Sequence, residues 1–283
     1  LGDSGELLLW IDDNNEKSDN NRTSLMYSVF DGSNWSEPTE VCRDGCFNGE
    51  FSYCIGSDGN IYIVFQKGNY IFENGTEYTQ IIRNIDPYLT VFDGNSFTEP
   101  VKVREDNSSY EDNIQVKNVN DKIELTFVEY TSDYLNGASD SMSIMETINN
   151  DNKWEESLIC SEDDFISDYA FADENLYVQV YNNSNGSYEL HSYNNESDKV
   201  IKSLSQEVDL VSSGSELYFI DGNILTTVAD GVESDSQIPY ASDYKVITNG
   251  SITDVVYEVI NNDKSSSIYY GQILDGKLDE TTI

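Results

Sequence analysis

Carboxylates are the side chains with the greatest chemical capacity in this sequence. The 283 residues include 53 Asp and Glu against 15 Lys and Arg, a formal net charge of -38. A glycoside hydrolase needs two carboxylates in a pocket that raises the pKa of one of them. Asp168 falls on an expected innermost strand and Glu50 just before another, but the expected innermost strands share no pattern of placed acids. A glycoside hydrolase therefore stands as the alternative to a non-enzymatic function.

Other catalytic chemistries lack the residues that they need. The one histidine, His191, lies in an ordinary strand-like run, YELHSY, which gives no support to a serine or cysteine hydrolase. Sialidase chemistry needs several arginines gathered around a substrate carboxylate. The chain has four, and those at 22, 43 and 104 fall near outer hairpins of the repeat described below. We therefore predict no catalytic residue and no organic cofactor.

Calcium is the one ion for which the sequence offers ligands. The segment IDDNNEKSDNN (11–21) carries Asp12, Asp13 and Asp19, whose oxygens suit Ca²⁺, although their spacing is not that of an EF-hand. A solvated acidic turn would explain the same residues. Zinc is disfavoured, because two cysteines separated by three residues and one remote histidine fit no usual zinc site.

Three of the four cysteines, Cys42, Cys46 and Cys54, fall within thirteen residues. Thiols this close oxidise readily outside the cell. The sequence therefore predicts a local disulfide, either Cys42–Cys46 or Cys46–Cys54, with simple burial of the thiols as the alternative.

Aromatic residues supply the candidate binding surface. Tyr70, Phe72 and Tyr78 lie in residues 68–85, and Tyr134 lies in residues 131–142; both segments look like loop insertions. Loops on one face of a rigid scaffold commonly carry recognition, and tyrosine rings stack on sugars. We predict that these four residues contact a polysaccharide or a protein ligand on the loop face.

The elements that must position these residues are indicated by an internal repeat. Residues 28–38, SVFDGSNWSEP, return after 62 residues as TVFDGNSFTEP at 90–100. Asp-Gly between two alternating runs is a strong hairpin signal. The aromatic residues that recur after the turn, Trp35, Phe97 and Trp154, are expected to pack between repeated units.

A second recurring pattern supplies an inner hairpin, as in SYCIGSDGNIYIVF at 52–65: a short strand, a polar turn and a strand rich in Tyr and β-branched residues. Four strands in about 49 residues match a propeller blade. The sequence predicts an all-β fold, a β-propeller of about six four-stranded antiparallel blades in one domain, with a β-sandwich as the alternative. The expected blades are residues 1–46, 47–107, 108–162, 163–206, 207–240 and 241–283.

The first residues, LGDSGELLLW, align with IGSDGNIYIVF at 55–65. Leu1 would then be the last residue of an innermost strand, so the first blade is expected to lack that strand in this chain. We accordingly expect the chain to come from a longer protein with flanking domains.

Charge and hydropathy limit the partners. A surface this acidic repels phosphate backbones and anionic lipid, so neither nucleic acid nor membrane insertion is expected. No run of 18 apolar residues occurs. Cations, neutral polysaccharides and basic proteins remain as partners.

The outer-hairpin phrase, together with WIDDNNEKSDNNRTSLMYSVFDG at 10–32, resembles the propeller-repeat segments of large secreted or surface-anchored bacterial proteins. Ser28, Asp31, Gly32 and Trp35 also keep the residue types, though not the spacing, of the Asp-box of sialidase-type propellers. The resemblance implies an extracellular or cell-surface location and a binding or adhesion role. We therefore expect a non-enzymatic extracellular adhesion or carbohydrate-binding module, with a structural spacer as a second alternative.

Overall fold

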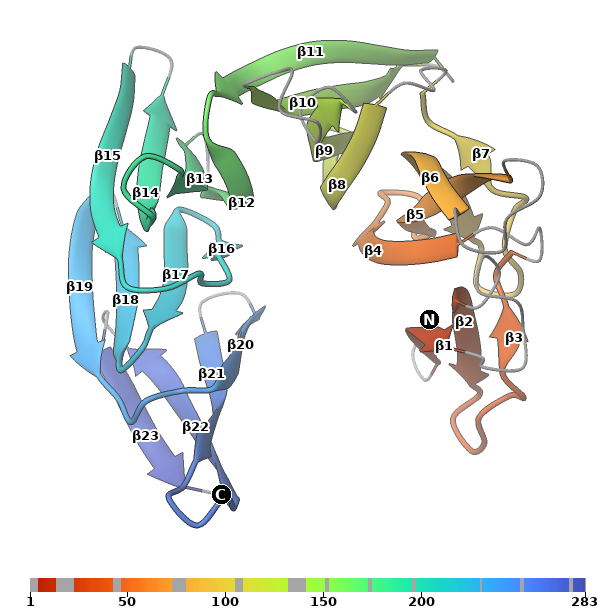
Figure 1. Ribbon diagram of the computed structural model, residues 1–283. Coiled ribbons are helices and arrows are strands. Elements are labelled where there is room, and N and C mark those ends of the chain that lie inside the picture. Colours follow the sequence, from red (N-terminus) through yellow and green to blue (C-terminus); the bar gives the residue numbers. More distant parts are fainter. Residues whose placement is uncertain are drawn as a thin grey trace. The chain divides into compact units, whose positions relative to one another are not determined.

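The structure is a computed structural model that describes residues 5–13, 23–42, 47–72, 80–104, 109–131, 141–150, 153–172, 175–194, 197–229, 231–249, 252–274 and 277–282. Every regular element in these residues is a β-strand (Figure 1). Within the same ranges there is no helix of the length and apolarity that crossing a membrane requires. The chain divides into two compact units, Leu1–Asp163 and Asp164–Ile283.

The first unit contains three antiparallel groups of strands, which we number sheets 1 to 3. Sheets 2 and 3 are joined into one eight-stranded sheet by a single parallel pairing, Ile85 with Tyr110. Sheet 1 has three described strands, and sheets 2 and 3 have four each. The strands are β1 (Glu6–Asp13), β2 (Thr23–Phe30) and β3 (Thr39–Glu40); β4 (Phe47–Ile55), β5 (Ile61–Phe72), β6 (Gln80–Phe92) and β7 (Val101–Lys102); β8 (Ser109–Val119), β9 (Lys122–Thr131), β10 (Met142–Asn150) and β11 (Lys153–Glu162).

The second unit contains three four-stranded antiparallel sheets, numbered 4 to 6, in which each strand pairs with its neighbours in sequence. The strands are β12 (Phe165–Ala172), β13 (Asn175–Asn182), β14 (Ser187–Asn194) and β15 (Ser197–Leu204); β16 (Val211–Ser213), β17 (Glu216–Asp221), β18 (Ile224–Ala229) and β19 (Val232–Gln237); β20 (Asp243–Asn249), β21 (Ile252–Ile260), β22 (Ser266–Leu274) and β23 (Lys277–Thr282). The predicted all-β fold of four-stranded antiparallel sheets is confirmed.

Burial within the sheets follows the composition of their strands. In sheet 5, the apolar second strand β17 is buried along most of its length, whereas the outermost strand, β19, reads VESDSQ and is mostly exposed. A strand buried on both faces needs apolar residues at successive positions rather than at alternate ones. The dense Tyr-rich and β-branched runs are thus the middle strands of stacked sheets.

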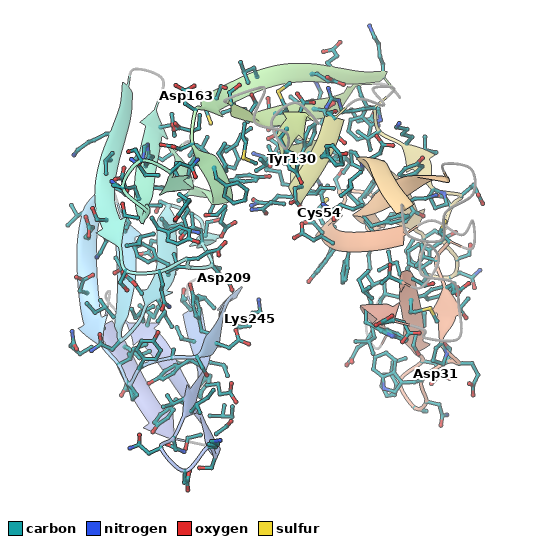
Figure 2. The ribbon with its side chains drawn as sticks, viewed as in Figure 1. Asp31, Cys54, Tyr130, Asp163, Asp209 and Lys245 are labelled. Carbon is teal, nitrogen blue, oxygen red and sulfur yellow. The ribbon has the colours of Figure 1, made fainter. Side chains whose placement is uncertain are left out.

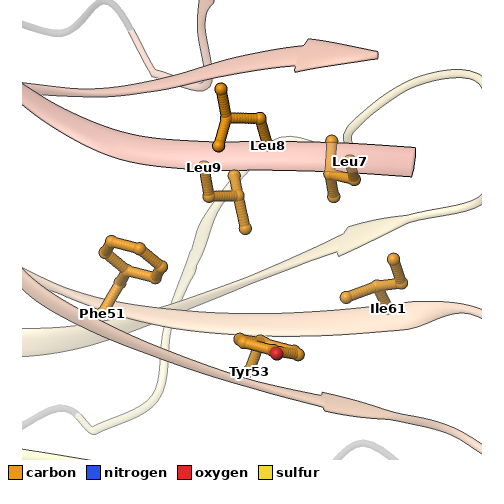
Figure 3. Close-up of a pocket in the computed structure, with 6 residues that line it drawn as sticks. All are labelled: Leu7, Leu8, Leu9, Phe51, Tyr53 and Ile61. Carbon is orange, nitrogen blue, oxygen red and sulfur yellow. The ribbon is translucent and has the colours of Figure 1, made fainter. Parts of the chain in front are cut away.

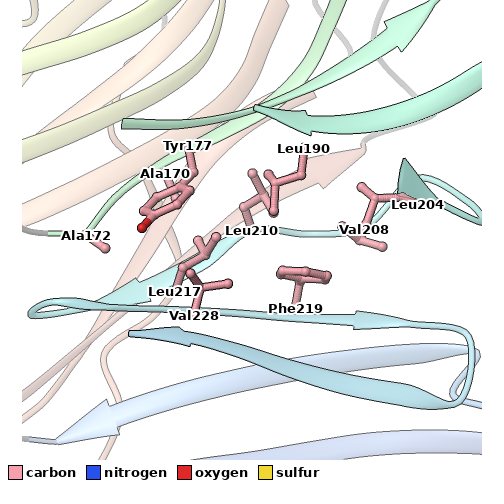
Figure 4. Packing of buried hydrophobic residues seen from close by; sticks show 10 residues of the cluster. All are labelled: Ala170, Ala172, Tyr177, Leu190, Leu204, Val208, Leu210, Leu217, Phe219 and Val228. Atoms are coloured by element: carbon pink, nitrogen blue, oxygen red, sulfur yellow. The ribbon is translucent and has the colours of Figure 1, made fainter. Parts of the chain in front are cut away.

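Apolar clusters hold successive sheets together within each unit. Val64 of sheet 2 packs with Ile114, Val116 and Leu125 of sheet 3. In the second unit, Leu190 and Leu204 of sheet 4 share a cluster with residues of sheet 5 (Figure 4). The members of that cluster are Ala170, Ala172, Tyr177, Leu190, Leu204, Val208, Leu210, Leu217, Phe219 and Val228.

The repeated phrase folds into the same hairpin twice. Oδ1 of Asp93 accepts hydrogen bonds from the backbone N–H groups of Asn95 at 2.9 Å and Ser96 at 2.8 Å, and Asp31 caps its own turn in the same way. These bonds lower the pKa of both carboxyl groups. Gly94 has φ +94°, a conformation that few other residues adopt without strain. The Asp-Gly pairs therefore build turns, and their carboxylates are committed to the backbone.

Candidate functional site

Most of the predicted aromatic binding surface lies outside the described residues. Residues 68–85 were expected to be a loop, but β5 continues to Phe72 and β6 begins at Gln80, so both ends of this segment are paired strands. Tyr70 pairs with Ile82, and Phe72 pairs with Gln80. The side chains of these residues, and the whole of Tyr78 and Tyr134, lie outside the described residues.

The predicted calcium ligands are only partly described. Asp12 and Asp13 end β1, opposite Ser24 and Thr23 of β2. Asp19 lies outside the described residues. Among those that are described, no group of three or more His, Cys, Asp or Glu side chains is arranged to hold a metal ion.

The predicted disulfides are absent, because Cys42 and Cys54 are both free thiols. Cys42 packs on the apolar cluster between sheets 1 and 2, and its Sγ accepts a hydrogen bond from Nζ of Lys67 at 3.6 Å. Cys54 packs on the cluster between sheets 2 and 3, and burial raises the pKa of its thiol to about 11. Cys46, the expected partner of both, lies outside the described residues. The alternative of simple burial fits Cys42 and Cys54.

A buried charge cluster joins sheets 2 and 3. Arg104 follows β7 and reaches three carboxylates on three strands of sheet 3. Its Nη1 lies 2.9 Å from Oε1 of Glu111 and also contacts Glu129, and its Nε lies 3.0 Å from Oε1 of Glu156. Its guanidinium carbon lies 5.5 Å from the centre of the Phe127 ring. Arg104 thus connects the segment that follows the last strand of sheet 2 to sheet 3 through three ion pairs.

Glu111 is the described carboxylate whose environment most resembles that of a catalytic acid. Burial raises its pKa to about 7, although the nearby Ser109 hydroxyl and Arg104 oppose the shift. The hydroxyl of Ser109 donates to its Oε1 at 2.6 Å. The side chain is fully buried, however, and Arg104 occupies the space beside it. This geometry fits a structural ion pair, and a fully buried carboxylate is not accessible to a substrate.

The second unit uses a lysine in the same way. Nζ of Lys202, on β15 of sheet 4, lies 5.7 Å from the centre of the Phe219 ring in sheet 5. It also lies 3.0 Å from Glu233 and 3.1 Å from Asp235, both on β19. In both units, therefore, a cation on or just after the last strand of one sheet lies over an aromatic ring of the next.

A carboxylate occurs on or just before the first strand in each of sheets 2 to 6, although we expected no acid pattern in these strands. Asp168 pairs with Gln179 of the second strand, and Asp243 pairs with Glu258 at the matching place in sheet 6. The five acids, which we call the inner acid row, are Glu50, Asp112, Asp168, Asp209 and Asp243.

The members of the row differ in burial and in whether they accept hydrogen bonds from neighbouring sheets. Oδ2 of Asp168 accepts a hydrogen bond from the backbone N–H of Leu210 at 2.6 Å, and Oδ1 of Asp112 accepts one from Nε2 of Gln66 at 2.8 Å. Glu50, Asp209 and Asp243 are exposed. Lys245 Nζ lies 4.0 Å from Asp209 Oδ2 (Figure 2). The exposed members present hydrogen-bond acceptors to solvent, so they are the better candidates for ligand contact.

An apolar pocket of about 290 Å³ lies beside β1 in the first unit (Figure 3). No motif or spacing in the sequence predicted this pocket. Its lining residues come from β1, β4 and β5; they are Leu7, Leu8, Leu9, Phe51, Tyr53 and Ile61. The available signal was the pair of aromatic residues on the first strand of sheet 2, Phe51 and Tyr53.

No family model and no curated protein matches the sequence. The fold does match solved structures, and these are β-propellers. The polysaccharide lyase Uly1 is 10% identical with a TM-score of 0.59, covering 96% of this chain and 75% of the lyase. A protein of unknown function from Dyadobacter fermentans is also 10% identical with a TM-score of 0.59. The match covers 96% of this chain and 91% of that protein. The Trypanosoma rangeli sialidase is 10% identical with a TM-score of 0.53, covering 95% of this chain and 52% of the sialidase. At these identities the likeness shows the fold alone.

Proposed function

We propose that this chain is a non-enzymatic extracellular binding module with a β-propeller fold, and that its ligand is a neutral polysaccharide. The observation that carries the proposal lies in the second unit, where Asp168, Asp209 and Asp243 place a carboxylate on or just before the first strand of sheets 4 to 6, and where Asp209 and Asp243 are exposed. Carboxylates accept hydrogen bonds from sugar hydroxyl groups, and a repeated acceptor suits a ligand that is itself a repeat. The net charge of -38 disfavours anionic polymers.

Two further observations make carbohydrate the first ligand class to test. Tyr53, which is largely exposed, follows Glu50 closely on the same strand and offers a ring for stacking. Two of the proteins with a similar fold are a polysaccharide lyase and a sialidase. The resemblance of residues 10–38 to the propeller repeats of large bacterial surface proteins supports the extracellular setting and an adhesion role.

The described carboxylates with raised pKa values favour binding over glycoside hydrolysis. Glu111 is fully buried against Arg104. The pKa of Glu146 is raised first by burial and then by a hydrogen bond to Glu124. Two carboxyl groups that are hydrogen-bonded to each other cannot flank a glycosidic bond, since glycoside hydrolysis needs the two catalytic carboxyl groups about 5 Å or more apart.

The proposal is tested by measuring the retention of the purified chain on a panel of immobilised neutral polysaccharides, with added Ca²⁺ and again with a chelator. We expect saturable binding to at least one polymer. The double variant Asp209→Asn, Asp243→Asn should weaken it about tenfold or more, as expected for the loss of two charged hydrogen-bond acceptors.

The matched control is Asp121→Asn with Glu155→Gln, which removes the same charge from two exposed acids outside the row. Equal weakening by both pairs would mean that net charge, and not the row, governs retention. No retention on any polymer in either condition would overturn the carbohydrate proposal.

A further inference from the structure

Tyr240 has the most exposed aromatic side chain among the described residues of the second unit, at 61%. It lies in the segment that joins β19 of sheet 5 to β20 of sheet 6. Its neighbours Ile238 and Ala241 are buried in the apolar cluster that these two sheets share. The backbone of this segment is therefore anchored, while the tyrosine ring is turned toward solvent.

The position of the Tyr240 ring is fixed by its surroundings. Its hydroxyl donates a hydrogen bond to Oε1 of Gln206 at 2.8 Å. The ring also lies against the turn between β17 and β18, because a Cβ atom at Gly222 would be only 3.4 Å from the Cε2 atom of the ring. The backbone N–H of Ala241 donates to the carbonyl oxygen of Gly222 at 3.1 Å. A ring held in this way loses little conformational entropy when a ligand stacks on it.

The exposed acids of the second unit lie close to this ring. Gln206, which holds Tyr240, is followed by Asp209 in the segment that leads into β16. The hydroxyl of Tyr244 donates to the carbonyl oxygen of Asp209 at 2.6 Å. Asp243 follows Tyr240 by three residues, so their Cα atoms are at most about 11 Å apart. A di- or trisaccharide can span such a distance, so one ligand can reach the ring and the acids together.

The chemistry of this surface selects among neutral sugars. A flat aromatic ring stacks on a sugar face that carries only C–H groups, whereas carboxylates accept hydrogen bonds from hydroxyl groups at the sugar's edge. A pyranose whose hydroxyl groups are all equatorial presents both surfaces at once, because its axial C–H groups form the faces and its hydroxyl groups surround the edge. An axial hydroxyl, as in mannose or galactose, puts a polar group on one face and weakens stacking there.

We propose that Tyr240 is the stacking platform of the polysaccharide site, and that the ligand is a β-linked glucan or xylan, in which hydroxyl groups and linkages are all equatorial. Asp209 and Asp243 accept hydrogen bonds from the sugar residues next to the stacked one. This inference rests on the proposed function, and it adds the stacking residue and the class of sugar.

Isothermal titration calorimetry with cellohexaose, xylohexaose and mannohexaose tests both additions. We expect cellohexaose or xylohexaose to bind at least about tenfold more tightly than mannohexaose. Tyr240→Ala should weaken that binding about tenfold or more, and Tyr240→Phe, which keeps the ring, by less than about threefold. The control Trp35→Ala, which removes an exposed ring from an outer hairpin of the first unit, should leave the affinity unchanged.

Tyr240→Leu provides a second variant if Tyr240→Ala does not fold, because it keeps apolar volume without a flat ring and should weaken binding as strongly. Binding that Asp209→Asn with Asp243→Asn weakens, but that Tyr240→Ala and Tyr240→Leu leave intact, would overturn the inference while the proposed function stands. Tighter binding of mannohexaose, or equal losses in Tyr240→Phe and Tyr240→Ala, would also overturn it. No binding of any neutral polysaccharide would overturn the proposed function, and this inference with it.

Discussion

Arg104 brings together three carboxylates that are far apart in the sequence. Glu111, Glu129 and Glu156 come from β8, β9 and β11, and the arginine itself precedes all three strands. Buried charges are stable only when they are paired. The cluster therefore makes the packing of sheet 3 on sheet 2 depend on one side chain.

Replacing Arg104 with Met should destabilise the first unit strongly, because Glu111, Glu129 and Glu156 lose the cation that they share. We expect a loss of about 3 kcal/mol in the free energy of unfolding, measured by urea denaturation. The control is Lys245→Met, which removes an exposed lysine 4.0 Å from Asp209 and should cost less than about 0.5 kcal/mol. Equal effects of the two substitutions would contradict the structural role of Arg104.

Glu111 should make the stability of the first unit depend on pH. Burial raises its pKa from 4.5 to about 7, so the folded protein holds a proton that the unfolded chain releases between these values. The stabilisation is full below about pH 4.5 and is lost as the pH rises through about 7. The urea midpoint of the wild type should thus fall more steeply between about pH 5 and about pH 8 than that of Glu111→Gln. Parallel pH profiles would show that Glu111 does not titrate in this range.

At the scale of elements, buried glutamines connect successive sheets. Nε2 of Gln179, on the second strand of sheet 4, donates to the carbonyl oxygen of Val208 at 3.0 Å, and Oε1 accepts from the Val208 N–H at 2.9 Å. Gln66 plays a similar role in the first unit, where its Nε2 donates to the carbonyl oxygen of Glu111 at 2.9 Å. Gln66 joins its sheet to the first strand of sheet 3, and Gln179 joins its sheet to the segment that leads into the first strand of sheet 5.

Gln179→Leu should therefore cost about 2 to 3 kcal/mol of stability in the second unit, because it leaves both backbone groups of Val208 without partners. Thermal and urea unfolding of this variant, compared with the exposed control Gln237→Leu, will measure the effect. A cost below about 0.5 kcal/mol would show that water or rearrangement replaces the lost hydrogen bonds.

The outer hairpins could be predicted from the sequence, whereas the inner acid row could not. Asp31-Gly32 and Asp93-Gly94 specify their turns locally, through side-chain bonds to the next residues and a positive φ at glycine. The first strands contain irregularities, for example between Asp112 and Gln115 and between Ile166 and Asp168. The acids are also unequally spaced along the chain. Their alignment therefore becomes visible only from the pairing of the strands. The Arg104 cluster is equally non-local, so spacing alone gave no sign of it.

At the scale of the whole molecule, the charge of -38 acts on both units. Like charges on a folded surface repel one another, and salt screens them over about 10 Å at 0.1 M. Raising NaCl from about 0.05 M to about 0.5 M should therefore raise the midpoint of thermal unfolding. A fall in the midpoint would mean that ion pairs such as those of Arg104 and Lys202 outweigh the general repulsion.

The proposed ligand contacts Asp209 and Asp243, the exposed members of the inner acid row in the second unit. The most direct measurement is hydrogen–deuterium exchange with and without a saturating neutral oligosaccharide from the retention screen. We expect slower exchange in the segments that begin at Asp209 and Asp243, with little change in the outer strand β19. Protection confined to outer strands or hairpin turns would contradict the claim and place the binding surface elsewhere.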